Sequence, residues 1–64
     1  MNNILNFKET EDIILSGGYL TPKQAAIYLG VKVKSLADYR SKNRKPEFIK
    51  YNQYVRYPPY AIIG

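Results

Sequence analysis

A chain of 64 residues with ten Lys/Arg against five Asp/Glu carries a net charge of +5, and its length allows one small domain with a modest core. It has neither cysteine nor histidine, which excludes disulfides, zinc sites and histidine-based acid–base catalysis. Its acids are scattered and it has no Gly-rich phosphate loop, so we expect no enzyme activity and no cofactor. No apolar run approaches the ~20 residues of a membrane span, and we expect a soluble cytoplasmic protein that binds no membrane.

Residues 1–18 form an N-terminal segment with weak local signals. Thr10 is predicted to cap a short helix, because the two acidic residues that follow it would lie at the positive N-terminal end. We expect residues 1–7 to fray. Ile14 and Leu15 supply apolar surface that would either cover the core or form an arm for a partner.

Residues 19–57 contain the strongest signals and begin with a first helix. Thr21 is the predicted N-cap, with Pro22 at the first helical position and Gln24 at the spacing of a capping box. Gly30 is expected to end this helix, because glycine tolerates the left-handed backbone of a helix terminus. A second helical pattern begins two or three residues later, which is typical of two helices joined by a tight turn.

The second helix is predicted to place Val33, Leu36 and Tyr39 on the core. Lys32 cannot cap it, so the helix either has a weak start or begins later, at Ser35. Its outward-pointing residues are then Lys34, Ser35, Ala37, Asp38 and Ser41.

The stretch that follows is rich in strand-forming residues and predicts a hairpin. Asn52 and Gln53 are expected to form its turn, with Phe48 and Val55 on the core side. Two prolines then end the second strand. The apolar tail, residues 58–64, would either fold back over the core or dock on another protomer.

The chain has seven tyrosines. A tyrosine can fill the outer shell of a small core with its hydroxyl in water, or it can stack on nucleic-acid bases. We expect Tyr19, Tyr28, Tyr39 and Tyr57 to serve packing. Tyr54, beside the predicted turn, is the best candidate for contact with a ligand.

Basic residues gather in one part of the chain. Between Lys32 and Arg56 there are eight Lys/Arg, opposed only by Asp38 and Glu47. A basic patch on one structural unit is the electrostatic footprint expected for nucleic-acid phosphates. The alternative is a small basic domain that binds no nucleic acid.

One run resembles the short helix-turn-helix domain of the excisionase and MerR-like superfamily, namely LTPKQAAIYLGVKVKSLADYRSKNRKPEFIKYNQYVRY. The likeness covers Tyr19 to Tyr57 and rests on LTPKQAAIYLGV, on a helix with Leu36 and Tyr39, and on a basic link to PEFIK and VRY. It implies a mainly α fold with a small β-hairpin, the winged helix-turn-helix. The second helix would enter the major groove, and the hairpin would contact the backbone or the minor groove.

The resemblance also implies a function, namely an accessory factor of a phage or mobile element that binds and bends double-stranded DNA beside a recombinase site. Such factors bias the integrase toward excision, and many repress promoters. The implied partners are double-stranded DNA and a recombinase or integrase, with self-association on DNA or through the C-terminal tail.

We assign the DNA contacts by position. Base readout is expected from Lys34, Ser35, Asp38 and Ser41, phosphate contacts from Lys23, Lys32, Arg40, Lys42, Arg44, Lys45 and Arg56, and hairpin contacts from Gln53, Tyr54 and Arg56. For Asp38 the alternative is a surface ion pair with Lys34 or Lys42. For the basic side chains it is a solvated surface charge.

Three other functions stay open. A transcriptional regulator of a phage or plasmid, or a DNA-packaging recognition module, would use the same fold. A protein-interaction module would instead bind a recombinase or polymerase through the tyrosine-rich hairpin and the apolar tail.

Overall fold

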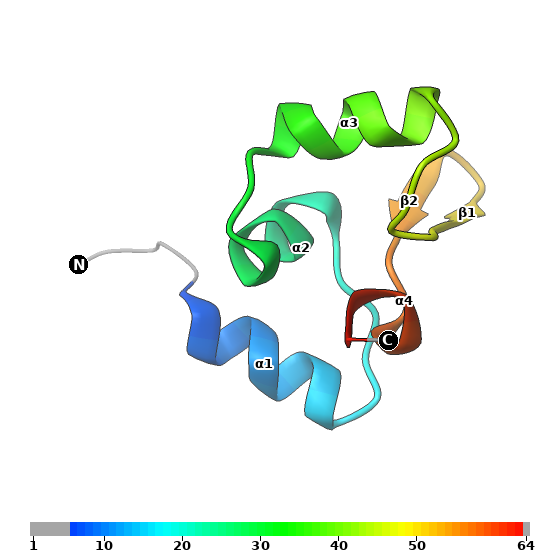
Figure 1. Cartoon of the computed structure of the whole chain (residues 1–64). Coiled ribbons are helices and arrows are strands. Elements are labelled where there is room, and N and C mark those ends of the chain that lie inside the picture. The colour runs from blue at the N-terminus through cyan, green and yellow to red at the C-terminus, as the bar shows by residue number, and fades with distance from the viewer. Residues whose placement is uncertain (1–5, 64) are drawn as a thin grey trace.

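Figure 1 shows the computed structural model of the chain, which describes residues 6–63. Three helices are followed by a two-stranded antiparallel sheet and a short last helix: α1 (Phe7–Leu15), α2 (Pro22–Leu29), α3 (Val33–Ser41), β1 (Ile49–Tyr51), β2 (Tyr54–Arg56) and α4 (Pro59–Ile63). The predicted class, mainly helical with a small hairpin, is confirmed. Within residues 6–63, every helix is too short or too polar to cross a membrane.

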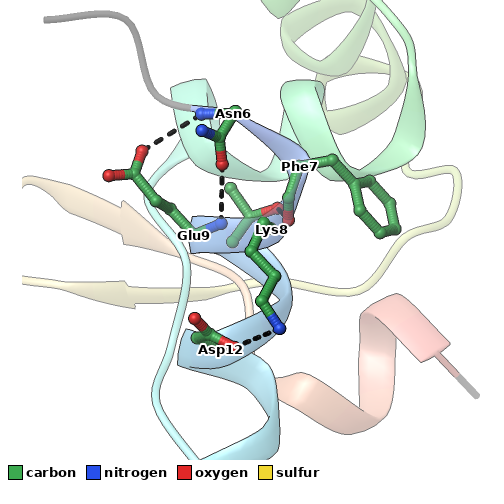
Figure 2. A network of polar contacts seen from close by, with 6 residues as sticks. Asn6, Phe7, Lys8, Glu9 and Asp12 are labelled. Atoms are coloured by element: carbon green, nitrogen blue, oxygen red, sulfur yellow. Dashed lines mark hydrogen bonds and ion pairs between the residues drawn. The ribbon is translucent and has the colours of Figure 1, made fainter.

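Helix α1 begins one turn earlier than predicted. The side chain of Asn6 accepts the amide N–H of Glu9 at 2.9 Å, and the Glu9 carboxylate accepts the amide N–H of Asn6 at 3.1 Å, so that the two form a capping box (Figure 2). The prediction that Thr10 caps the helix is wrong. Thr10 is fully buried within α1, and its Oγ1 donates to the carbonyl of Phe7 at 2.7 Å.

The other predictions for the N-terminal segment have mixed outcomes. Residues 1–5 lie outside the described part of the chain, but Phe7 is helical, and its ring stacks on Tyr28 with centroids 4.8 Å apart. Ile14 is buried as predicted, whereas Leu15 is 76% exposed, so its predicted core position is wrong. Successive residues of a helix point about 100° apart, and only one of the two can face the core. Helix α1 packs on α2 and is part of the core.

Helix α2 has the predicted ends. Thr21 Oγ1 accepts the amide N–H of Gln24 at 3.2 Å, and the Gln24 side chain accepts that of Thr21 at 2.9 Å. Gly30 has a φ of 72°, and the next amide, of Val31, donates to the carbonyl of Ala26 at 3.0 Å. This left-handed terminus turns the chain sharply toward α3.

Helix α3 begins at Val33 with no side-chain cap from Lys32. The weak start is therefore confirmed, and the later start at Ser35 is wrong. Leu36 is fully buried and Tyr39 packs partly buried against the core, as predicted. Val33 is 45% exposed, so its predicted core position is wrong. It lies in the first turn of α3, directly after the solvent-exposed end of the connecting turn.

The core lies around α2, which stands between α1 and α3 (Figure 1). Ala25 and Ala26 are buried on α2, and their small side chains let the two neighbouring helices approach closely. The remaining buried hydrophobic residues are Ile14, Leu20, Leu36, Tyr57 and Ile62. Phe48 and Val55 pack against this cluster from the hairpin side, as predicted.

The hairpin has the predicted turn at Asn52 and Gln53, with Asn52 at a φ of 58°. Directly after β2, Tyr57 exchanges two backbone hydrogen bonds of 2.8 and 2.9 Å with Leu20. The hairpin is thereby joined to the extended segment that leads into α2. Since Leu20 faces the core, the preceding Tyr19 points the other way and is exposed. The prediction that Tyr19 serves packing is wrong.

The tail after the hairpin forms α4 and folds back over the core. Ile62 is buried, which confirms the first of the two alternatives for this segment. Tyr60 and Ile63, on the same α4, are exposed. The short helix therefore contributes one apolar side chain to the core and leaves two in solvent.

A pair of substitutions tests the helical phase of α3, that is, which of its residues face the core. Leu36→Ala should lower the free energy of unfolding by ~2–5 kcal/mol, because it empties a fully buried site. Val33→Ala should change it by less than ~1 kcal/mol, because the side chain is half in solvent and alanine favours helix. Urea denaturation followed by circular dichroism measures both. Equal effects of the two substitutions would contradict this phase.

Candidate functional site

Helix α3 presents one polar, mainly basic face to solvent. Lys32, Lys34, Ala37, Asp38 and Ser41 are exposed, while Ser35 is half-buried. The residues predicted for base readout are thus brought together on a single helix, with Ser35 the least accessible. Lys23, predicted for a phosphate, is exposed in the first turn of α2.

Asp38 is paired along the helix. Its Oδ2 lies 3.3 Å from Nζ of Lys42, and both side chains are more than half exposed. This ion pair at i,i+4 spacing is the alternative that the sequence predicted for Asp38. Ser41 donates its hydroxyl to the main-chain carbonyl of Asp38 at 2.9 Å. The Asp38 carboxylate therefore lowers the net positive charge in the middle of this face. The positive charge of the face is concentrated near the start of α3, at Lys32 and Lys34.

A basic loop follows α3. Asn43 has a φ of 59°, and the amide N–H of Arg44 donates to the carbonyl of Tyr39 at 2.8 Å, so the helix ends in a left-handed turn like that of α2. Arg44 and Lys45 are exposed, and Lys45 Nζ lies 3.6 Å from a carboxylate oxygen of Glu47. The loop thus holds two cations in solvent between α3 and the hairpin.

Arg40, predicted to contact phosphate, is half-buried and engaged within the chain. Its Nη1 donates to the hydroxyl of Tyr57 at 2.6 Å, and its Cζ lies 5.9 Å from the centre of the Phe48 ring. These contacts connect α3 to the hairpin. The sequence analysis missed this role, because Tyr57 is separated from Arg40 by the whole loop and the β-hairpin.

The hairpin presents the remaining predicted residues. Gln53 is exposed in the turn and Tyr54 is exposed on β2. Arg56 is half-buried, since its Nη1 donates to the carbonyl of Val55 at 2.8 Å and its Cζ lies 5.5 Å from the centre of the Tyr54 ring. The Arg56 guanidinium is therefore held against the sheet beside an exposed aromatic ring.

Figure 1 shows the hairpin beside the C-terminal end of α3. Helix α3, the basic loop and the hairpin follow one another along this side of the molecule. Within residues 6–63, no group of three or more acidic side chains is placed to hold a metal ion. The chemistry available at this surface is that of cations, hydroxyls, amides and aromatic rings, with the carboxylates of Asp38 and Glu47 each paired with a lysine.

Comparisons with protein-family models, with curated proteins and with solved structures gave no match. A function for this chain therefore rests on the arrangement of its side chains and on the pattern of the run from Tyr19 to Tyr57.

The link between α3 and the hairpin can be measured with a double-mutant cycle. Arg40→Met and Tyr57→Phe each remove one partner of the hydrogen bond and keep most of the apolar contact. We expect a coupling of about 1–2 kcal/mol in the free energy of unfolding, because the donor is charged and half-buried. Arg44→Met, a change at an exposed arginine in the loop, is the matched control and should show almost no coupling to Tyr57→Phe. A coupling near zero for Arg40 would contradict a structural role.

Proposed function

We propose that this chain is a sequence-specific binder of double-stranded DNA that acts as a winged helix-turn-helix. In this proposal α3 enters the major groove, and the β1–β2 hairpin serves as the wing along the backbone. The observation that carries it is the exposed face of α3, where basic and hydroxyl side chains stand on a helix that a tight turn joins to α2.

The geometry around α3 supports insertion into a groove. Helix α3 is anchored from behind by Leu36, while Lys34, Asp38 and Ser41 point away from the core. A major groove admits one α-helix, and side chains of this kind can bond to base edges there. Lysine matches the acceptors of guanine, and a serine hydroxyl can bond to any base.

The charges flanking this face support binding to phosphate. Lys32 stands at the start of α3 and Arg44 and Lys45 stand after its end, all exposed. Contacts at both ends would fix the register of the helix on the duplex. Arg40 contributes mainly by holding the hairpin, as its bond to Tyr57 indicates.

Within this class we propose an excisionase-type accessory factor, on the strength of the resemblance in the run from Tyr19 to Tyr57. Such a factor would bind and bend DNA beside a recombinase site, act with the recombinase, and repress transcription where its site overlaps a promoter. A transcriptional regulator shares the architecture, and the layout of the DNA sites distinguishes the two. Direct repeats suit head-to-tail copies, whereas palindromes suit a two-fold dimer.

A selection from randomised duplexes at near-physiological salt tests the proposal. We expect an enriched motif. Lys34→Ala should then weaken binding to that motif by ~1–3 kcal/mol and relax the preference at one base pair. Lys8→Ala is the matched control, because Lys8 is exposed and pairs with Asp12 at 3.6 Å (Figure 2) on α1, the helix that lies across α2 from α3 (Figure 1). It should leave both affinity and preference unchanged.

The absence of enrichment would contradict the proposal. It would favour an interaction module whose basic surface attracts nucleic acid without reading sequence. An equal loss from Lys34→Ala on every duplex would instead make Lys34 a phosphate contact.

The dependence of affinity on salt measures the phosphate contacts. If about five phosphates are neutralised, the logarithm of the association constant should fall with that of the salt concentration at a slope near −4.5. Lys32→Ala should make the slope shallower by about one unit without changing the motif, because it removes one such contact. A slope near zero would show that the cations do not face the DNA.

A further inference from the structure

The hairpin has an outer face with an unusual composition. The register pairs Ile49 with Arg56 and Tyr51 with Tyr54, and side chains alternate along each strand, so these four side chains share one face of the sheet. The opposite face carries Val55, which packs against the core. The outer face therefore consists of two tyrosine rings, one branched apolar side chain and one guanidinium.

The two rings are open to solvent. Tyr51 is 70% exposed and Tyr54 is 53% exposed, directly opposite each other beside the turn. Tyrosines that serve packing in this chain behave differently, since Tyr57 is fully buried and Tyr28 and Tyr39 are partly buried. Packing in or against the core accounts for the positions of those three rings. It does not account for Tyr51 and Tyr54, whose rings lie mainly in solvent.

The Tyr54 ring is also held in place. The Arg56 guanidinium lies 5.5 Å from the centre of this ring. The same guanidinium donates to the carbonyl of Val55 at 2.8 Å, which fixes it to the sheet. A fixed ring loses little conformational freedom when a flat partner stacks on it.

The surrounding charge selects the kind of partner. Arg56 shares the outer face, and the exposed Arg44 and Lys45 stand in the loop that leads into the hairpin. An apolar protein surface gains nothing from these cations, and a second copy of this hairpin would bring like charges together. A polyanion with flat, apolar rings fits both features.

We infer that the outer face of the β1–β2 hairpin binds unpaired bases of single-stranded nucleic acid, which stack on Tyr51 and Tyr54 while the nearby cations bind the phosphates. Inside a duplex each base is covered on both faces by its neighbours, so rings can stack only on bases that are unpaired. Stacking of this kind is tolerant of sequence, because every base has a π-face. The inference extends the proposed DNA binding to a second surface and to a second form of the nucleic acid.

The test uses the whole chain and a fluorescent oligothymidylate of about 12 nucleotides, which forms no duplex and fits the usual site size of such proteins. Binding is followed by fluorescence anisotropy. Tyr51→Ala and Tyr54→Ala should each weaken binding about 5-fold to 150-fold, which corresponds to the stacking range of ~1–3 kcal/mol per base. Tyr51→Phe should retain most of the affinity, because the ring remains.

Tyr60→Ala is the matched control. Tyr60 is 63% exposed, comparable to the hairpin tyrosines, but it lies on α4. It should leave the affinity for the oligonucleotide unchanged. The same variants are also assayed on a duplex, where Tyr51→Ala and Tyr54→Ala should cost clearly less affinity than on the oligonucleotide, because paired bases cannot stack on the rings.

Several results would overturn the inference. They are an unmodified chain that does not bind the oligonucleotide, alanine variants that bind it as well as the unmodified chain does, an equal loss for Tyr60→Ala, or a loss on the duplex as large as that on the oligonucleotide. Failure of the proposed duplex recognition is distinguishable from failure of this inference. In that case the selection shows no motif, while single-strand binding still depends on Tyr51 and Tyr54.

Discussion

The structure depends on the position of one fully buried side chain, Tyr57. Its backbone exchanges hydrogen bonds of 2.8 and 2.9 Å with Leu20, its hydroxyl accepts from Arg40 at 2.6 Å, and its ring lies tilted against Phe48 with centroids 6.3 Å apart. One residue thereby joins the hairpin, the lead-in to α2, and α3. An isolated two-stranded hairpin is marginal in water. These contacts give the hairpin a defined place beside α3, which a surface made jointly by the two elements requires.

This arrangement divides the surface by chemical character. Residues 13–22 and 57–63 contain no Lys, Arg, Asp or Glu, and they meet at the bridge between Leu20 and Tyr57. The charges remain on α1, at the start of α2, and above all along α3, the loop after it and the hairpin. The acids of α1 are separated from the basic face by α2 (Figure 1). A polyanion approaching α3 therefore meets few opposing carboxylates, and the nearest one, Asp38, is already paired with Lys42.

Local sequence signals predicted the ends of helices correctly where two signals coincided. Thr21 and Gln24 form a capping box, and Gly30 adopts the left-handed conformation that the sequence predicted. The same rule applied to the N-terminal segment would have found the true start of α1, because Asn6 is followed three residues later by Glu9. Thr10 has Ile13 at that spacing, which cannot complete a capping box. A lone cap residue was therefore a weaker signal than a pair.

Features whose causes are local could be predicted from the amino-acid sequence alone. These are the two helices joined at Gly30, the hairpin with its turn at Asn52, and the concentration of basic residues after Lys32. Which side chains these elements leave in solvent depends on tertiary packing. It buried Thr10 and half-buried Arg40, and it exposed Val33 and the tyrosine pair beside the hairpin turn. The physical reason is that capping and turn formation act over a few residues. Burial and the Arg40–Tyr57 bond depend on neighbours that only the folded chain brings together.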